Sequence, residues 1–187
     1  MVDIPTDMWI PALTKPAETL AKANKKKASL VDAAIVMTLA GAVCGAVVGL
    51  MAGPMGLIGG AIGGAIATLL MSLLGNGVVW VMAKILGGKG EFSQQYCLYS
   101  LFGAPIAIAG VLNIVPVLGG ILNGLLSLYM LYPLTLSIKE VHKLDTVKAV
   151  LAWLIPGIVL AIVAFIVGAA IAAMLVMYGL TQAGSFG

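Results

Sequence analysis

Hydrophobic positions along this chain fall into five long runs, separated by short polar or glycine-rich segments. Each run reaches about 18 residues or more, the length at which an apolar stretch indicates a membrane-spanning helix rather than a helix of a soluble core. The runs occupy residues 30–52, 57–86, 96–115, 121–138 and 147–178. The pattern therefore predicts an all-α, polytopic integral membrane protein with five transmembrane helices.

The segments between the runs are of two kinds. Residues 53–56 and 116–120 are short and rich in Gly and Pro, which is typical of tight turns. Residues 87–95 and 137–149 are polar. We therefore expect two helical hairpins, one made of the first two spans and one of the third and fourth, followed by a fifth span.

The same pattern divides the chain into three parts. We expect a short N-terminal segment with a surface helix in residues 1–29, a membrane domain in residues 30–178 and a short tail in residues 179–187. Bilayer lipids are then the first partners of the protein. Lysines near the first span would hold the N-terminal segment against anionic headgroups.

The lysines predict how the chain is oriented in the membrane. Only 9% of the residues are charged, and all 10 basic residues are lysines that flank the N-terminal segment or the two polar loops. Short loops that are rich in lysine face the cytoplasm. The N-terminus is therefore expected in the cytoplasm and the C-terminus outside. The lysines are Lys15, Lys22, Lys25, Lys26, Lys27, Lys84, Lys89, Lys139, Lys143 and Lys148.

Glycines recur at every fourth position in the first two spans. Small residues at this spacing let two membrane helices approach closely, so we expect these glycines to pack the first hairpin. Self-association into a homo-oligomer and a pore lined by glycines are the alternatives, and the pore would make the protein a passive channel or small-molecule transporter. The glycines are Gly41, Gly45, Gly49, Gly53, Gly56, Gly60 and Gly64.

Little in the sequence indicates catalysis. The cores of the spans carry no acid, base or histidine, and one histidine with two separated cysteines cannot complete a metal site. We expect no enzyme activity, no cofactor and no metal. No basic surface interleaved with aromatic residues is long enough to follow a nucleic acid, so nucleic-acid binding is not expected either.

A polar island, SIKEVHKLDTVKA at residues 137–149, separates the last two spans. Asp145 precedes an apolar run and is expected to cap the fifth helix. Glu140 and Lys143 are three residues apart and are expected to form a surface pair. We interpret the island as a solvated connector, in which Lys139, His142 and Lys143 are candidates for contact with a partner.

Three stretches carry a resemblance to a known family. They are GGKGEFSQQYCLYSLFGAP (87–105), NIVPVLGG (113–120) and LLSLYMLYPLTLSIKEVHKLDTVKAVLAWLIP (125–156). In this order they resemble the Yip-domain proteins, which are named for interaction with Ypt/Rab GTPases. The N-terminal Asp7-Met8-Trp9-Ile10-Pro11 is similar to the family's DLYGP motif, with Ile10 in place of Gly. Tyr99-Ser100, followed by Pro105, is similar to its GYSxxP motif.

The resemblance implies a five-span fold with a cytoplasmic N-terminus. Eukaryotic members act in vesicle traffic and bind prenylated Rab GTPases, so a small GTPase is the cytoplasmic partner it implies. The candidate partner-binding residues are Asp7, Trp9, Pro11, Tyr99, Ser100, Lys139, His142 and Lys143.

The N-terminal segment is short, and its brevity points to the plasma membrane of an archaeon or bacterium. The function we expect is a non-enzymatic membrane adaptor or scaffold that organises the membrane or recruits a cytoplasmic partner. The passive channel described above is one alternative. A protein that shapes the membrane through its hairpins is the other.

Overall fold

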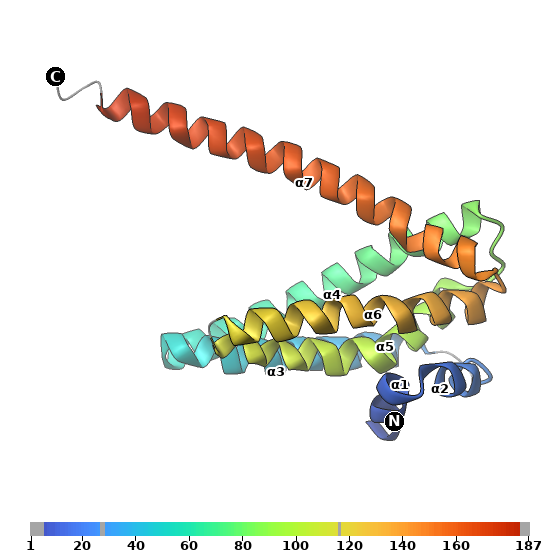
Figure 1. Cartoon of the computed structure of the whole chain (residues 1–187). Helices are drawn as coiled ribbons and strands as arrows, with labels where there is room; N and C mark the ends of the chain where they lie inside the picture. The colour runs from blue at the N-terminus through green and yellow to red at the C-terminus, as the bar shows by residue number, and fades with distance from the viewer. Residues whose placement is uncertain (1–5, 27–28, 116, 184–187) are drawn as a thin grey trace.

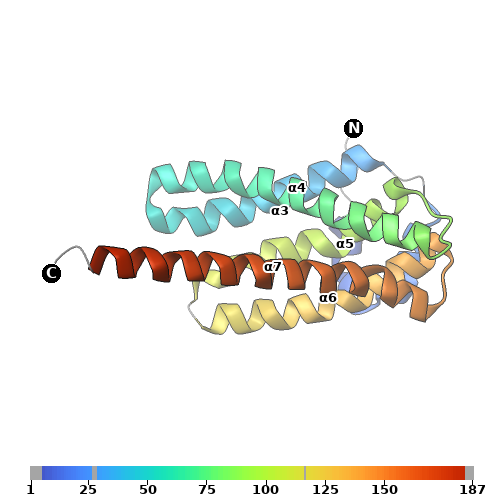
Figure 2. The same cartoon turned by 90° about the horizontal axis from the view of Figure 1, so that it is seen from above.

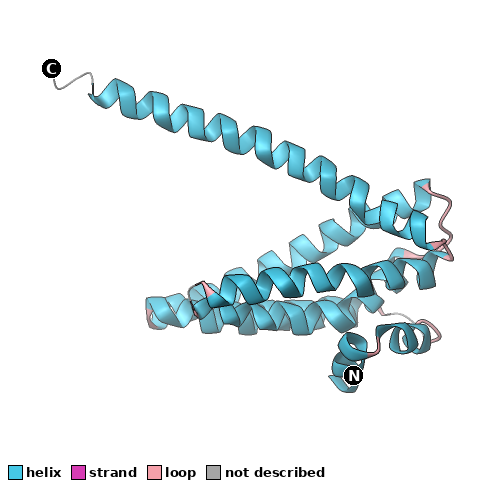
Figure 3. Ribbon diagram, viewed as in Figure 1, coloured by secondary structure: helices cyan, strands magenta, loops and turns pink. Residues whose placement is uncertain are grey.

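The computed structural model describes residues 6–26, 29–115 and 117–183, and within these ranges the secondary structure is helical, with no strand (Figure 3). Five helices are long and apolar enough to cross a membrane, as predicted. Two short helices and a 3-10 turn precede them (Figure 1). The elements are η1 (Thr6–Met8), α1 (Trp9–Thr14), α2 (Pro16–Ala23), α3 (Leu30–Gly49), η2 (Leu50–Ala52), α4 (Pro54–Ile85), α5 (Phe92–Ala109), η3 (Gly110–Ile114), α6 (Leu118–His142) and α7 (Thr146–Ala183).

The helices extend further than their apolar runs. Residues 92–95, expected in a polar loop, form the first turn of α5, and residues 137–142 of the polar island belong to the end of α6. The side chains of Ser137 and His142 are buried, so only residues 143–145 connect α6 to α7. The sequence pattern misplaced these boundaries because a helix that packs its last turns against other helices can bury polar side chains there. Lys27 and Pro116 lie outside the described residues.

The first hairpin is held by contact between backbones. α3 and α4 run side by side and are joined by a tight turn (Figure 2). A Cβ atom added at Gly45 would collide with the carbonyl oxygen of Gly60, and Gly41 and Gly49 face Gly64 and Gly56 in the same way.

Gly53 has a different position from the other glycines of this series. It lies in the turn with a φ of 87° and no neighbour within 4 Å of its position for a Cβ. Glycine is favoured at this position because the backbone has a positive φ, not because two helices come into contact there.

The second hairpin is closed by a polar contact. η3 continues α5, and Nδ2 of Asn123 in α6 donates to Oδ1 of Asn113 at 3.1 Å. At the opposite end of the bundle α3 begins, α4 ends, α5 begins, α6 ends and α7 begins. Every lysine in the described ranges lies near this end, which we call the lysine end.

Helix α7 is attached to the bundle only near its start. Asp145 caps it as predicted, because Oδ1 accepts a hydrogen bond from the backbone N–H of Lys148 at 2.9 Å. Ala149 and Ala152 pack against α4 and α6, and Nε1 of Trp153 donates to Thr135 at 2.9 Å. From Gly157 onward every described side chain is exposed, and α7 diverges from the other helices (Figure 1).

The N-terminal helices pack against the membrane helices. Met8, Ala12 and Leu20 are buried in a cluster with residues of α5 and α6, among them Phe102 and Val141. The surface helix expected within residues 1–29 corresponds to α2, and it contacts the protein through its apolar face.

Substitution of the packing glycines should separate α3 from α4. We expect Gly45→Leu to lower the free energy of unfolding by about 1–3 kcal/mol, as overpacking does in other interiors. Unfolding in mixed micelles of mild and denaturing detergent measures the change. Gly63→Leu is the matched control, because nothing lies within 4 Å of a Cβ there, and it should shift stability by no more than about 0.5 kcal/mol. Equal losses in the two variants would contradict the assignment of the contact.

Candidate functional site

A chain of buried polar side chains joins α6, α5 and α4 near the lysine end. Nε2 of His142 lies 2.8 Å from Oε1 of Gln95, and Nε2 of Gln95 donates to the backbone oxygen of Asn76 at 3.1 Å. Nδ2 of Asn76 donates to the backbone oxygen of Ser72 at 2.9 Å, and the hydroxyl of Ser72 pairs with that of Tyr96 at 2.7 Å. We call these five residues the buried polar chain. It fixes the positions of three helices relative to one another.

The histidine of this chain is enclosed by protein. His142 is only 1% exposed, and its Nε2 carries the proton because Oε1 of Gln95 can only accept a hydrogen bond. Its Nδ1 is buried next to Gly88 and has no hydrogen-bond partner among the described residues. The imidazole therefore cannot reach a partner on the surface or a substrate in solution. It joins α6 to α5.

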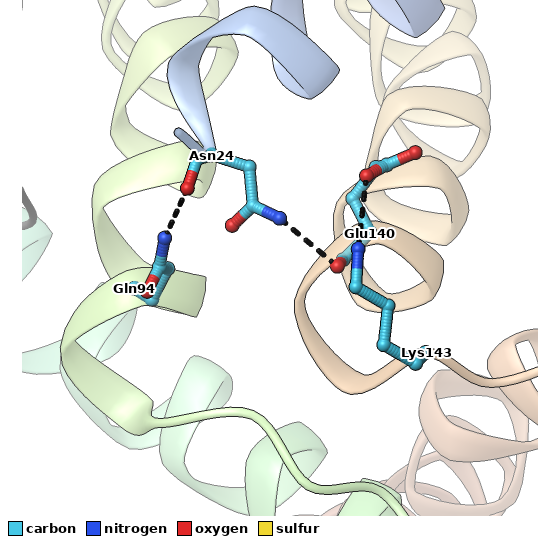
Figure 4. Close-up of polar contacts among 4 residues, drawn as sticks. All are labelled: Asn24, Gln94, Glu140 and Lys143. Carbon is cyan, nitrogen blue, oxygen red and sulfur yellow. Dashed lines mark hydrogen bonds and ion pairs between the residues drawn. The ribbon is translucent and has the colours of Figure 1, made fainter. Parts of the chain in front are cut away.

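The end of the N-terminal segment is fastened by Asn24. Its Nδ2 donates to the backbone oxygen of Glu140 in the last turn of α6 at 3.0 Å, and its own backbone oxygen accepts a hydrogen bond from Nε2 of Gln94 in α5 at 2.5 Å (Figure 4). The last carbonyls of a helix have no partner within the helix. Asn24 therefore caps α6 from another part of the chain, as the N–H of Lys89 does for the carbonyl of His142 at 3.3 Å.

The start of the N-terminal segment is fastened further along α6. The hydroxyl of Tyr129 donates to the backbone oxygen of Leu13 at the end of α1. Trp9 is half-buried against the cluster that contains Tyr96 and Ala104, and its Nε1 has no partner among the described residues. The segment is thus bound at both ends, and α1 lies along the side of the bundle rather than beyond its tip.

The structure separates the predicted partner-binding residues into exposed and buried groups. Asp7, Pro11 and Lys143 are exposed, and Lys143 forms the expected ion pair with Glu140 at 3.5 Å. Lys139 is half-buried and donates to Thr146 at 2.7 Å, which joins α6 to the first residue of α7.

Three further candidates face the interior of the bundle. Ser100 is 5% exposed and donates to the backbone oxygen of Cys97, so neither Ser100 nor His142 lies on the surface where a partner contact was expected. Tyr99 is half-buried, with its ring between those of Tyr96 and Phe102. These three side chains pack inside the bundle, beneath the exposed candidate residues.

The sequence pattern does not single out several residues that matter here. Asn24, Gln94 and Gln95 each pair with a residue far away in the chain, and Gln94 and Gln95 fall in a stretch that composition assigns to a loop. The signal that could find Gln95 is its helical spacing. It lies three residues before Leu98 and seven before Phe102, both of which are buried on the same helix.

The surface around the site carries more lysines than acids, of which Glu91 and Asp145 are exposed. The exposed lysines near the lysine end include Lys22, Lys25, Lys84, Lys89 and Lys148. Within the described ranges, the only ion pair is the one between Lys143 and Glu140. Each exposed lysine near an anionic surface contributes roughly 1 kcal/mol of attraction. In residues 6–26, 29–115 and 117–183, no group of three or more His, Cys, Asp or Glu side chains could hold a metal ion.

Comparison with known proteins gives one positive result. The family model described as Yip1 domain matches residues 11–168, a range that includes α2 and the five long helices as far as the middle of α7. Neither a curated protein nor a solved structure matches the chain.

Removal of the Asn24 side-chain contact should loosen the N-terminal segment. Loss of one hydrogen bond of about 1 kcal/mol in Asn24→Ala should raise the open population of the segment about fivefold. The rate of trypsin cleavage after Lys22 in the purified protein reports this opening. Thr14→Ala is the control, since the hydroxyl of this exposed residue bonds only within α1. An unchanged cleavage rate in Asn24→Ala would refute the fastening role.

The buried polar chain should show energetic coupling between its members. Gln95→Leu leaves the ring of His142 unpaired, and a buried unpaired group costs about 1–3 kcal/mol. The double variant Gln95→Leu, His142→Leu removes both partners, so its loss of unfolding free energy should be smaller than the sum of the two single losses. A double-mutant cycle in detergent measures the coupling. Strict additivity would count against the hydrogen bond between Gln95 and His142.

Proposed function

We propose that this chain, which belongs to the Yip1 domain family, is a non-enzymatic membrane adaptor that recruits a cytoplasmic protein to the bilayer. Family membership and five apolar helices make it an integral membrane protein of the Yip type. The adaptor role is our proposal beyond family membership and membrane insertion. It is supported mainly by the N-terminal segment, which is held on the bundle with an exposed outer face.

The outer face of the segment has the features of a contact surface. Asp7 and Pro11 are exposed there, and between them Ile10 is 73% exposed although it is a large apolar residue. Met8 and Ala12 on the opposite face are buried against the bundle. An apolar residue beside polar ones on a fixed helix is a surface that a protein partner can bury without first ordering it.

Charge favours a partner with an acidic surface. Lys22 of α2, Lys25 just after α2 and Lys143 just after α6 are exposed, and α2 and α6 contact one another. Lysine-rich segments face the cytoplasm, which supports a cytoplasmic partner and a cytoplasmic N-terminus. The resemblance to eukaryotic members implies a small GTPase as the class of partner. We propose the plasma membrane of an archaeon or bacterium as the location.

The buried candidates have an indirect role in this proposal. His142 joins α6 to α5, the hydroxyl of Ser100 bonds within α5, and Tyr99 and Trp9 pack the cluster on which α1 rests. The N-terminal segment keeps its position on the bundle because the side chains beneath it are packed in place.

A pore through the first hairpin is less well supported than the adaptor. Gly45 and Gly60 are in contact through their backbones, and the same holds for Gly41 with Gly64. Glycines that touch leave no path for a solute between α3 and α4.

Photo-crosslinking in native membranes tests the proposal. A crosslinking residue at position 10 or 143 should capture the same soluble protein, and one at the exposed position 174 near the far end of α7 should not. Lys22→Glu with Lys25→Glu should reduce the capture about tenfold, the effect expected when charge complementarity is inverted. Capture that does not differ between positions 10 and 174, or that is unchanged by the charge reversal, would overturn the proposal.

A further inference from the structure

An apolar crevice lies where α7 leaves the bundle. It has a volume of about 400 Å³ and is bounded by α4, α6 and α7, with Tyr99 of α5 also in its lining. Gly75 and Val79 line it from α4, Leu134 from α6, and Trp153, Gly157 and Leu160 from α7. Figure 1 shows α7 diverging from α4 and α6 just beyond this point.

The lining of the crevice is mostly apolar, so it can make van der Waals contacts with hydrocarbon but offers few groups for hydrogen bonds. Of its two polar side chains on α4, the hydroxyl of Ser72 pairs with Tyr96 and Nδ2 of Asn76 donates to the backbone of Ser72, while Oδ1 of Asn76 has no partner among the described residues. Water is stable in a buried space only where it finds two or more polar partners. An empty space of this size would forfeit the dispersion contacts of its walls. The crevice is therefore suited to an apolar chain.

The size and the shape of the crevice determine whether a second protein helix or a narrower apolar chain can occupy it. A helix is about 10 Å across and rises 5.4 Å per turn, so about 400 Å³ holds only one turn of a second protein helix. The crevice is closed toward the lysine end, where Ala83, Ile138 and Ala149 pack together. It is open on the other sides, because α7 makes no buried contact beyond Pro156. A narrow, flexible chain can enter from the side, between α7 and its neighbours.

Charge indicates the headgroup of the molecule that supplies this chain. Each helix that bounds the crevice carries a lysine five residues beyond its last lining residue toward the lysine end: Lys84 after Val79 on α4, Lys139 after Leu134 on α6, and Lys148 before Trp153 on α7. Five residues of helix span about 7.5 Å. The three lysines therefore lie about 7.5 Å beyond the lining along their helices, where Nζ of Lys84 lies 5.6 Å from the centre of the Trp80 ring and Nζ of Lys139 donates to Thr146.

We propose that the crevice binds an acyl chain of an anionic phospholipid, whose headgroup lies on the outer surface of the bundle at the level of Lys84, Lys139 and Lys148. The chain fills the space between α7 and the bundle, and the lysines select the negatively charged headgroup. This site is separate from the exposed face of the N-terminal segment, although Tyr99, Met130 and Leu134 both line the crevice and pack against the cluster beneath that segment.

Tryptophan fluorescence can detect the bound chain directly. Trp153 lines the crevice, and Trp9→Phe with Trp80→Phe leaves it as the single tryptophan. This protein is reconstituted in vesicles of phosphatidylcholine with a minor fraction of phosphatidylglycerol, with bromine on the acyl chains of one lipid at a time. Brominated phosphatidylglycerol should quench Trp153 at least about fivefold more per molecule than brominated phosphatidylcholine, because a single one of the three lysines near the headgroup already gives that preference. Native mass spectrometry of the unaltered chain provides a second readout, in which phosphatidylglycerol should be retained in preference to phosphatidylcholine.

Matched glycine variants separate the crevice from the general lipid surface. Nothing lies within 4 Å of a Cβ at Gly75, Gly77, Gly157 or Gly168, so Leu fits at each position without collision. Gly157→Leu and Gly75→Leu fill the crevice and should abolish the preference. Gly168→Leu and Gly77→Leu, on the same helices outside the lining, should retain it.

The lysine variants test the headgroup. Lys84→Gln with Lys139→Gln and Lys148→Gln should make the two lipids equal, and Lys22→Gln should change nothing. Equal quenching by both lipids in the starting protein, or a preference that survives Gly157→Leu and Gly75→Leu, would overturn the proposal. Protection of Trp153 from both brominated lipids would also overturn it, because a protein chain would then occupy the crevice.

Discussion

Polar groups that are cut off from water must find partners within the protein, and this constraint shapes the lysine end of the bundle. A buried group without a partner costs more than a formed hydrogen bond contributes. His142, Gln95 and Asn76 come from three helices, and none could be buried if the other helices were elsewhere. Tyr96 and Ser72 extend the same chain. The helices are therefore positioned by hydrogen bonds as much as by the shape of their apolar faces.

The two ends of the bundle are held by different physical means. At the turn end, Gly49 and Gly56 bring α3 and α4 into backbone contact, so van der Waals packing dominates. At the lysine end, the free carbonyls of α6 are satisfied by Asn24 and by the loop that carries Lys89. The N-terminal segment is thus part of the folded unit, because it supplies a cap that α6 lacks.

The sequence predicts the parts of this structure that depend on local pattern. Five spans follow from run length, and the cap at Asp145 follows from a polar residue at the start of an apolar helix. The pairing of His142 with Gln95 and of Asn24 with Glu140 joins residues that are distant in the chain. Such pairings leave no periodic signal. Their polar side chains instead made the ends of α5 and α6 look like loops, so the site was only partly predictable.

Attachment of α7 at one end alone has a consequence for the response of the protein to its membrane. The helix has 38 residues, which is about 57 Å at 1.5 Å per residue, nearly twice the hydrocarbon thickness of a bilayer. It must therefore tilt or protrude. A helix packed along its whole length would have its tilt fixed by its neighbours. No described side chain of α7 is buried beyond Pro156, so contacts with the other helices fix the direction of α7 only at its start and the surrounding lipid determines the rest.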